Sequence, residues 1–369
     1  MNPIATAAVQ VLLLFAAATF AFDCIHFILH QLVQSRHPWL VALGRLHQAH
    51  HDFFDTRLRL HEELIGRNLL HHVVPEVLTQ LAVTSVAFAV LPPWPVLAAM
   101  AVEVAFGVST LLVRGKDPYH RPVARVPAPR SWVVTPEYHA VHHVHPDTHY
   151  GSYTVLFDLL LGTAVGFKGR TVALTGAGGA FGSALRELLE AEGARVVPLK
   201  FGAAFDGRGV AESGREVLAS ADILVLAHGS RRVRPMEGNC DSFVALIEAF
   251  KALTAGRQVP PEVWALGSEI EAHPSFGIAE LQAYSASKRA FARHARRYAK
   301  DPEICYRHIV PSAFRSAMGP GLISARMAAR AALFLIRRGF RYVPVTYTGV
   351  ALVNYLKYRF GPRAPAPVL

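Results

Sequence analysis

Histidine is the residue type in this sequence with the clearest chemical spacing. Its clusters have members three or four residues apart: His26 and His30; His47, His50 and His51; His139, His142 and His143. Residues at these spacings share one face of a helix, so each cluster would present its imidazoles in one direction. Imidazole is a good ligand for iron, copper, nickel and zinc. Eight such ligands are more than one metal ion uses, so the clusters predict a site for two metal ions.

The overall composition places these histidines in a folded, hydrophobic chain. Of the 369 residues, 52% are hydrophobic and 18% are charged, which excludes a disordered chain. The three cysteines are far apart, which excludes a disulfide scaffold and a cysteine-ligated zinc finger. Residues 1–168 hold equal numbers of basic and acidic residues, 11 of each, whereas residues 169–369 carry the whole net charge of +11. We therefore expect two different domains, residues 1–165 and 166–369.

Three apolar segments in the first domain have the length of a membrane-spanning helix: residues 4–22, 73–91 and 95–113. A cleavable signal peptide is the alternative for the first segment, and a buried soluble hairpin is the alternative for the other two. Within the third segment, Glu103 would have to face a protein interior. The basic residues near the segment ends place residues 23–72 in the cytosol, together with everything after residue 113. We predict an all-α domain that is integral to a membrane, and we expect this membrane to be a bacterial inner membrane.

The third histidine cluster lies within a longer motif. The sequence Thr135-Pro-Glu-Tyr-His-Ala-Val-His-His143 is followed by Asp147-Thr-His-Tyr-Gly151 and Leu156-Phe-Asp-Leu-Leu-Leu-Gly-Thr163. These stretches resemble the TPxxHxxHH, NYG and WDxxFGT motifs of the membrane fatty acid hydroxylase/sterol desaturase superfamily. The resemblance implies a non-haem di-iron centre that uses O₂ to hydroxylate or desaturate a lipid. It also implies an external electron donor.

The resemblance leaves two ligand positions open. If His30 begins the first family motif, its partner position holds Gln34, a poor iron ligand. His26 or His37 could substitute, and helical spacing favours His26. One further ligand is expected from His71, His72 or His120. The predicted ligand set is therefore His26, His30, His47, His50, His51, His72, His139, His142 and His143.

The second domain opens with a nucleotide-binding pattern. A predicted strand at residues 171–175 leads into the glycine turn Gly176-Ala-Gly-Gly-Ala-Phe-Gly182 and then into a helix. Such a turn lets the backbone approach a pyrophosphate, to which the helix N-terminus offers its N–H groups. A parallel α/β domain without a cofactor is the alternative. The next predicted strand ends at Lys200 instead of an acidic residue, which favours NADP(H) over NAD(H).

A second motif in this domain is Tyr284-Ser-Ala-Ser-Lys288, with the tyrosine and lysine one helical turn apart. The lysine can lower the pKa of the tyrosine and hold a ribose, and the tyrosine can then exchange a proton with a carbonyl oxygen. Together with the glycine turn, this motif resembles the short-chain dehydrogenase/reductase family over residues 169–350. We therefore expect a Rossmann-type, doubly wound parallel sheet.

The dehydrogenase resemblance also implies functional residues. The implied catalytic residues are Ser268, Tyr284, Lys288 and Asn239, with Ser275 as the alternative serine because the interval between Ser268 and Tyr284 is unusually long. The implied cofactor contacts are Thr175, Gly176, Gly178, Gly179, Ala180, Phe181, Gly182, Lys200, His228, Gly229, Tyr284 and Lys288. Among these, His228 stands where the family has a small residue.

The last 82 residues are strongly basic, since residues 288–369 hold 16 Lys and Arg against two acidic residues. A face directed at anionic lipid explains this balance better than nucleic acid, because no groove-reading motif accompanies it. Residues 348–360 mix apolar, aromatic and basic side chains and are expected either in the membrane interface or as a solvated helix.

The order of the two domains resembles bifunctional sterol desaturase/short-chain dehydrogenase proteins. It implies a membrane oxidoreductase of lipid metabolism that combines O₂-dependent chemistry with NAD(P)H-dependent carbonyl/alcohol interconversion. One alternative keeps only the reductase active, with a degenerate metal site. The other is a nucleotide-sensing membrane scaffold without turnover.

Overall fold

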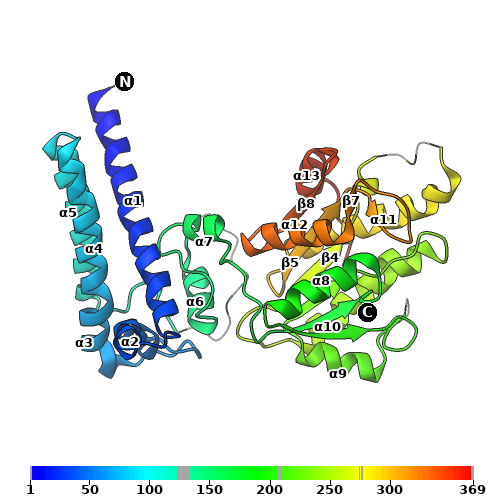
Figure 1. Cartoon of the computed structure of the whole chain (residues 1–369), viewed down its shortest axis with the longest axis horizontal. Coiled ribbons are helices and arrows are strands. Elements are labelled where there is room, and N and C mark those ends of the chain that lie inside the picture. Colours follow the sequence, from blue (N-terminus) through cyan, green and yellow to red (C-terminus); the bar gives the residue numbers. More distant parts are fainter. Residues whose placement is uncertain are drawn as a thin grey trace. The chain divides into compact units, whose positions relative to one another are not determined.

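The computed structural model describes residues 2–122, 126, 133–206, 209–273, 275 and 277–366. The chain divides into two compact units, Met1–Val165 and Gly166–Leu369. The first unit is helical and the second contains a parallel sheet flanked by helices (Figure 1). The predicted fold class, an all-α membrane domain followed by a Rossmann-type sheet, is confirmed.

The first unit is built from helices of very different lengths. They are α1 (Pro3–Leu32), α2 (Pro38–Phe53), η1 (Glu62–Leu64), α3 (Ile65–Asn68), η2 (Leu69–Val73), α4 (Val74–Ser85), η3 (Val86–Ala89), α5 (Pro93–Leu112), α6 (Pro136–Val144) and α7 (Leu156–Leu161). Helices α1, α4 and α5 pack against one another. Proline stands in the first turn of α1, α2, α5 and α6, where its missing N–H breaks no helical hydrogen bond.

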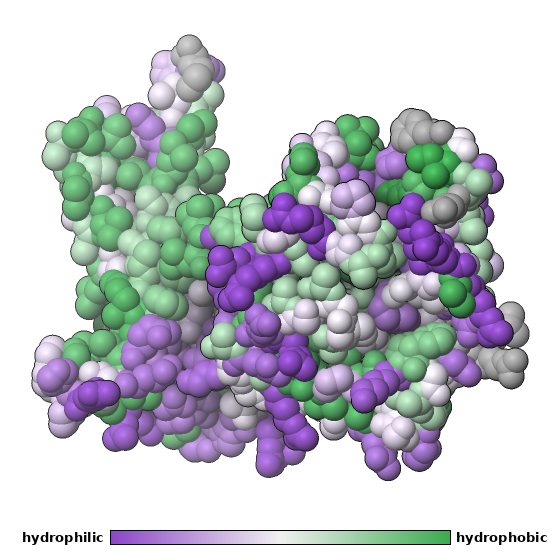
Figure 2. Space-filling view, turned by 45° about the vertical axis from the view of Figure 1, so that its right-hand side comes forward, coloured by the Kyte–Doolittle hydropathy of each residue, from purple (hydrophilic) through white to green (hydrophobic). Residues whose placement is uncertain are grey.

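Three helical segments are long and apolar enough to cross a membrane: Pro3–Leu32, Glu62–Ala89 and Pro93–Leu112. They coincide with the three predicted spans. In the most apolar 18-residue stretch of each segment, only 28%, 17% and 22% is buried inside the unit. Their hydrophobic surface therefore faces outward, and Figure 2 shows it as a tall green band. A soluble hairpin would bury this surface, whereas lipid covers it without cost.

Glu103 takes the predicted inward orientation. Its side chain in α5 is fully buried, and it accepts a hydrogen bond from the Thr84 hydroxyl of α4. The carboxyl group therefore has a partner inside the helix bundle and does not meet lipid.

Helix α2 crosses the end of α1 at a very short distance. A Cβ atom added to Gly44 would lie 2.7 Å from the carbonyl oxygen of Leu29 and 2.9 Å from the backbone nitrogen of Val33. Any side chain at Gly44 would therefore push the two helices apart. This crossing sets the histidine cluster of α2 opposite the histidine cluster of α1.

The second unit is a doubly wound sheet. Its elements are β1 (Thr171–Thr175), α8 (Ala180–Ala191), β2 (Arg195–Leu199), α9 (Glu212–Ser220), β3 (Ile223–Leu226), η4 (Glu237–Asp241), α10 (Ser242–Leu253), β4 (Glu262–Leu266), η5 (Glu269–Glu271), α11 (Ala279–Tyr298), β5 (Cys305–Pro311), β6 (Phe314–Arg315), β7 (Ile323–Ser324), α12 (Ala325–Arg337), β8 (Tyr342–Val345) and α13 (Val350–Phe360).

The main sheet has the parallel order β2-β1-β3-β4-β5-β8. The chain moves outward in one direction from β1 to β2 and in the other direction from β3 to β8. The order therefore reverses between β1 and β3. In open sheets of this type, ligands bind beside that reversal, at the carboxyl ends of the strands. The glycine turn and the Tyr284 helix both follow strands that end at this edge.

Candidate functional site

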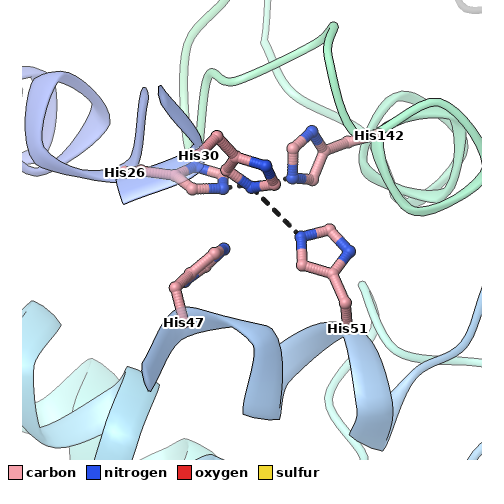
Figure 3. A group of neighbouring side chains, drawn as sticks. All are labelled: His26, His30, His47, His51 and His142. Atoms are coloured by element: carbon pink, nitrogen blue, oxygen red, sulfur yellow. Dashed lines mark hydrogen bonds between the residues drawn. The ribbon is translucent and has the colours of Figure 1, made fainter. Parts of the chain in front are cut away.

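The histidines of the first unit form two adjoining groups. The first group is His26, His30, His47, His51 and His142, and the second is His50, His120, His139 and His143. Within each group, one ring nitrogen of every member lies within 4.8 Å of the others. Figure 3 shows the first group, with rings from α1, α2 and α6 turned towards a shared space.

Hydrogen bonds orient several of these rings. The Nδ1 atom of His142 lies 2.6 Å from the carbonyl oxygen of Thr148, and that of His26 lies 3.2 Å from the carbonyl oxygen of Tyr150. In the second group, His50 Nδ1 lies 3.0 Å from Asn68 Oδ1. A carbonyl oxygen only accepts, so each Nδ1 carries the proton and each Nε2 keeps its lone pair for the shared space.

The spacing of the Nε2 atoms fits a metal centre. The Nε2 atoms of His26 and His142 are 3.1 Å apart, and His143 Nε2 is 3.2 Å from His50 Nε2. His26 and His142 both carry the proton on Nδ1, so the lone pairs of their Nε2 atoms face each other. In the second pair, His50 carries its proton on Nδ1 and likewise directs a lone pair at His143. Two nitrogens bound at right angles to a metal ion at about 2.1 Å would be about 3.0 Å apart. The buried atom His47 Nε2 also lacks a hydrogen-bond partner, so these residues fit a metal ion.

Burial keeps the histidines of α2 and α6 in the form that binds metals. It lowers the pKa of His47, His50, His51 and His143 well below the usual value, and that of His142 to about 3. Neighbouring histidines add to the effect by repelling a second positive charge. Neither group includes a carboxylate among the described residues. The imidazoles are therefore neutral, with lone pairs available for a cation.

Eight of the nine predicted ligands fall into the two groups, and the ninth place is taken by His120 instead of His72. His72 lies in the π-helical turn η2, where its ring stacks on His50 with centroids 3.8 Å apart. His120 Nε2 instead lies 3.1 Å from His139 Nε2, and its Nδ1 is held by Asp117. His120 comes from a loop, so helical spacing could not favour it over its two competitors.

The first cluster is completed by His26, as helical spacing favours. His37 is exposed at the N-cap of α2 and belongs to neither group, and Gln34 is also exposed. The roles of all these histidines as ligands remain predictions.

Asp158 is a positioning residue for which no role was predicted. It is fully buried, accepts the N–H groups of Tyr150 and Gly151 at 2.9 and 2.8 Å, and accepts the hydroxyl of Tyr138 at 2.6 Å. It thereby ties α6 to the loop whose Tyr150 carbonyl orients His26. Its position in the stretch that resembles the WDxxFGT motif could have indicated this role in the sequence.

The glycine turn of the second unit has the geometry of a nucleotide site. Gly176 has φ +67°, and a Cβ atom there would lie 2.6 Å from the backbone of Ala227 and His228. At Gly178, by contrast, nothing lies within 4 Å of a Cβ position. Helix α8 begins without a side-chain cap, so no capping side chain occupies its first N–H groups. The turn therefore fits a dinucleotide pyrophosphate.

The other predicted cofactor contacts divide into backbone and side-chain roles. Thr175 Oγ1 accepts the N–H of Ala227 at 3.1 Å, which joins the turn to the end of β3. Phe181 is buried, so only its backbone can face a nucleotide. Lys200 is exposed at the end of β2, as a contact to a ribose phosphate requires. His228 binds Thr175 and Ser242 through its two ring nitrogens, which leaves only ring carbons for the cofactor.

The predicted catalytic residues converge at the carboxyl end of β4. Burial raises the pKa of Tyr284, whereas the neighbouring Ser268 side chain lowers it, and the Lys288 ammonium donates to the carbonyl oxygen of Leu266 at 2.8 Å. Asn239 is buried and donates to the carbonyl oxygens of Ser230 and Pro235. It therefore shapes the loop after β3.

The structure brings Ser268, and not the alternative Ser275, to Tyr284. Ser268 directly follows Gly267 at the end of β4, whereas the contact given for Ser275 is its carbonyl oxygen accepting the N–H of Ile278. The catalytic roles themselves stay predictions.

Lys288 should give the carbonyl-reducing reaction a pH limit. Burial lowers its pKa to about 8, although the nearby Glu271 charge opposes this shift. The ammonium form, which is present below that pH, is the one that supports Tyr284. We expect the rate of NADPH-dependent reduction to fall as pH rises through about 8.

The pH–rate profile of the full-length protein measures this limit, and Lys288→Arg is the control because its guanidinium stays charged. In that variant the residual activity should persist to higher pH. A wild-type rate that rises between pH 8 and 9 would contradict the role of Lys288.

Fold and sites together define a membrane-associated oxidoreductase of two domains, one with clustered histidines and one with a Rossmann-type sheet. Comparison with known proteins adds detail to this class. Residues 11–163 match the Fatty acid hydroxylase family. The chain is 28% identical to the monoglucosyldiacylglycerol epimerase of Synechocystis sp. over 390 aligned positions, which cover 90% of each chain.

Two solved short-chain dehydrogenases show low similarity to part of this chain. A short-chain dehydrogenase from Burkholderia cenocepacia in complex with NADP is 19% identical with a TM-score of 0.39, and the match covers 53% of this chain and 96% of that one. A short-chain dehydrogenase from Sphingobium yanoikuyae in complex with NADPH is 15% identical with a TM-score of 0.40, covering 51% and 92%.

Proposed function

We propose that this protein is a bifunctional oxidoreductase of membrane lipids. The second unit would interconvert a secondary alcohol and a ketone on a lipid with NADP(H), and the first would use a di-iron centre and O₂ on a lipid chain or sterol. The observation that carries the proposal is that Ser268, Tyr284 and Lys288 lie together at the carboxyl edge of the sheet, the edge at which the glycine turn follows β1.

Tyr284, Ser268 and Lys288 would each have a role in alcohol oxidation. NADP(H) supplies the hydride acceptor and donor. In oxidation the phenolate form of Tyr284 would take the hydroxyl proton of the substrate at Oη, and in reduction the phenol form would return that proton to the carbonyl oxygen. Ser268 donates a hydrogen bond to the same oxygen, and Lys288 holds a positive charge beside the tyrosine.

In the first unit, the two histidine groups would hold iron, which supplies O₂ activation. The buried histidines orient their Nε2 atoms, and Asp158 fixes the loop behind them. The outward apolar surface of α1, α4 and α5 would give a lipid direct access from the bilayer. Electrons would come from an external donor.

A second candidate function is epimerisation of a lipid-linked sugar. It is favoured by the relative that matches 90% of both chains and is named for such an activity. Oxidation of one ring hydroxyl followed by reduction from the opposite face inverts that carbon, and Tyr284 would serve both half-reactions. No net oxidation occurs, so the nucleotide would be regenerated in each cycle.

The test incubates full-length protein in nanodiscs with NADP⁺ or NADPH and either monoglucosyldiacylglycerol or a lipid with a secondary alcohol. Alcohol–ketone conversion changes NADPH absorbance in proportion to product, whereas epimerisation changes the sugar without a net change in NADPH. Boiled protein is the control. If neither the ketone or alcohol product nor the epimerised sugar forms with NADP⁺ or with NADPH, the proposal for the second unit is overturned.

A further inference from the structure

The second unit exposes its large hydrophobic side chains at one edge and on two helices. Among its described residues, those exposed outside helices all lie in loops at the carboxyl edge of the sheet: Phe201, Val233, Met236, Ile278, Met318, Leu322 and Tyr347. The described loops at the opposite edge expose none. A folded domain scatters single apolar residues over its surface, so this one-sided concentration indicates an interaction surface.

Five of these side chains come from the loops after β3, β4 and β5, and we call them the apolar rim: Val233, Met236, Ile278, Met318 and Leu322. Val233 and Leu322 are 73% and 75% exposed. Arg231 joins two of the loops, because it donates to the carbonyl oxygen of Met318 at 2.8 Å. The segments after β3, β4 and β5 all leave the sheet at its carboxyl edge, where the strand before the Tyr284 helix also ends. The rim therefore lies at the same edge of the sheet as the site that contains Tyr284.

Helix α13, which follows β8, also exposes apolar side chains. Leu352, Val353, Leu356 and Phe360 are 59%, 73%, 60% and 80% exposed. At 100° per residue they fall on one face of the helix. The opposite face, formed by Ala351, Asn354 and Tyr358, is buried.

The loop after β3 and helix α13 are basic. The loop carries Arg231, Arg232 and Arg234, of which Arg234 pairs with Glu237 at 3.3 Å, and α13 carries Lys357 and Arg359. A surface that combines exposed apolar side chains with basic groups is complementary to the interface of an anionic bilayer. A bilayer is also within reach, because the same chain contains three candidate membrane-spanning helices.

We propose that the apolar rim and the exposed face of α13 insert into the surface of the bilayer, so that the mouth of the Tyr284 site opens onto lipid headgroups. A lipid could then present its polar group to Tyr284 while its chains remain in the membrane. The last step rests on the proposed function, whereas membrane contact of the rim does not.

Fluorescence quenching tests the contact without requiring turnover. Leu322→Cys and Val233→Cys variants of the full-length protein are labelled with an environment-sensitive fluorophore in nanodiscs containing phosphatidylglycerol. Spin-labelled acyl chains are added as quencher. Ser220→Cys, exposed at the opposite edge of the sheet, is the matched control, and labelled parent protein gives the background of the native cysteines.

We expect several-fold stronger quenching at residues 322 and 233 than at residue 220. Equal quenching at all three positions, or none at the rim, would overturn the proposal. So would protection of the rim probes by a second copy of the chain, seen as energy transfer between differently labelled molecules in one nanodisc. If the quenching is found but no lipid is converted, the proposed function fails and the membrane contact stands.

Discussion

The purified His142→Ala variant is expected to lose half of its iron, from two ions per chain, one for each histidine group, to one. His142 is the only member of the first group that α6 contributes. Its ring is buried, its Nδ1 is held by the Thr148 carbonyl, and its Nε2 lies 3.1 Å from that of His26. Alanine removes this donor and leaves the second group complete. O₂-dependent activity, if it needs both ions, should fall below detection.

Metal analysis of protein purified in detergent measures this effect. His37→Ala is the matched control, because His37 is exposed and outside both groups, so its iron content should equal that of the wild type. Size-exclusion chromatography checks that each variant is folded, and His142→Gln retains more of the side-chain volume. A wild-type protein without bound transition metal would refute the di-iron proposal and favour the reading in which only the reductase is active.

The Tyr284→Phe variant is expected to lose about a hundred- to ten-thousand-fold in the turnover of alcohol, ketone or sugar, the range typical of a general acid–base group. Its hydroxyl, which neighbours Ser268, is the group that would exchange the proton. The ring remains, so packing near Lys288, whose ammonium lies 5.9 Å from the ring centroid, should change little. NADPH affinity should therefore stay close to that of the wild type.

Product formation and NADPH binding, followed on the same sample, separate the two effects. Tyr355→Phe makes the same chemical change at an exposed position on α13 and should leave turnover unchanged. If Tyr284→Phe is as active as the wild type, Tyr284 has no part in the mechanism. Intact nucleotide binding without turnover by the wild type would support the scaffold reading.

Much of the fold follows from patterns local in the chain. The three apolar segments have the length of a bilayer, and burial within the unit is too small for them to be a soluble core. Strand, glycine turn and helix are contiguous at residues 171–191, so their order is read directly from the sequence. The spacing of each histidine cluster is likewise a property of a single helix.

What the sequence by itself determined are the two domains and the chemistry they carry: clustered imidazoles in a membrane domain and a Tyr–Lys pair after a glycine turn. The tertiary structure alone decided which residues meet. Helix α2 sends His47 and His51 to one group and His50 to the other, and α6 similarly separates His142 from its neighbours. It also places His120, and not His72, in one of the two histidine groups, and it brings Ser268, and not Ser275, close to Tyr284. These groupings depend on how segments far apart in the sequence cross, as α1 and α2 do at Gly44. The direction of a side chain is set by its own helix, whereas the residue that it meets is set by the packing of another segment.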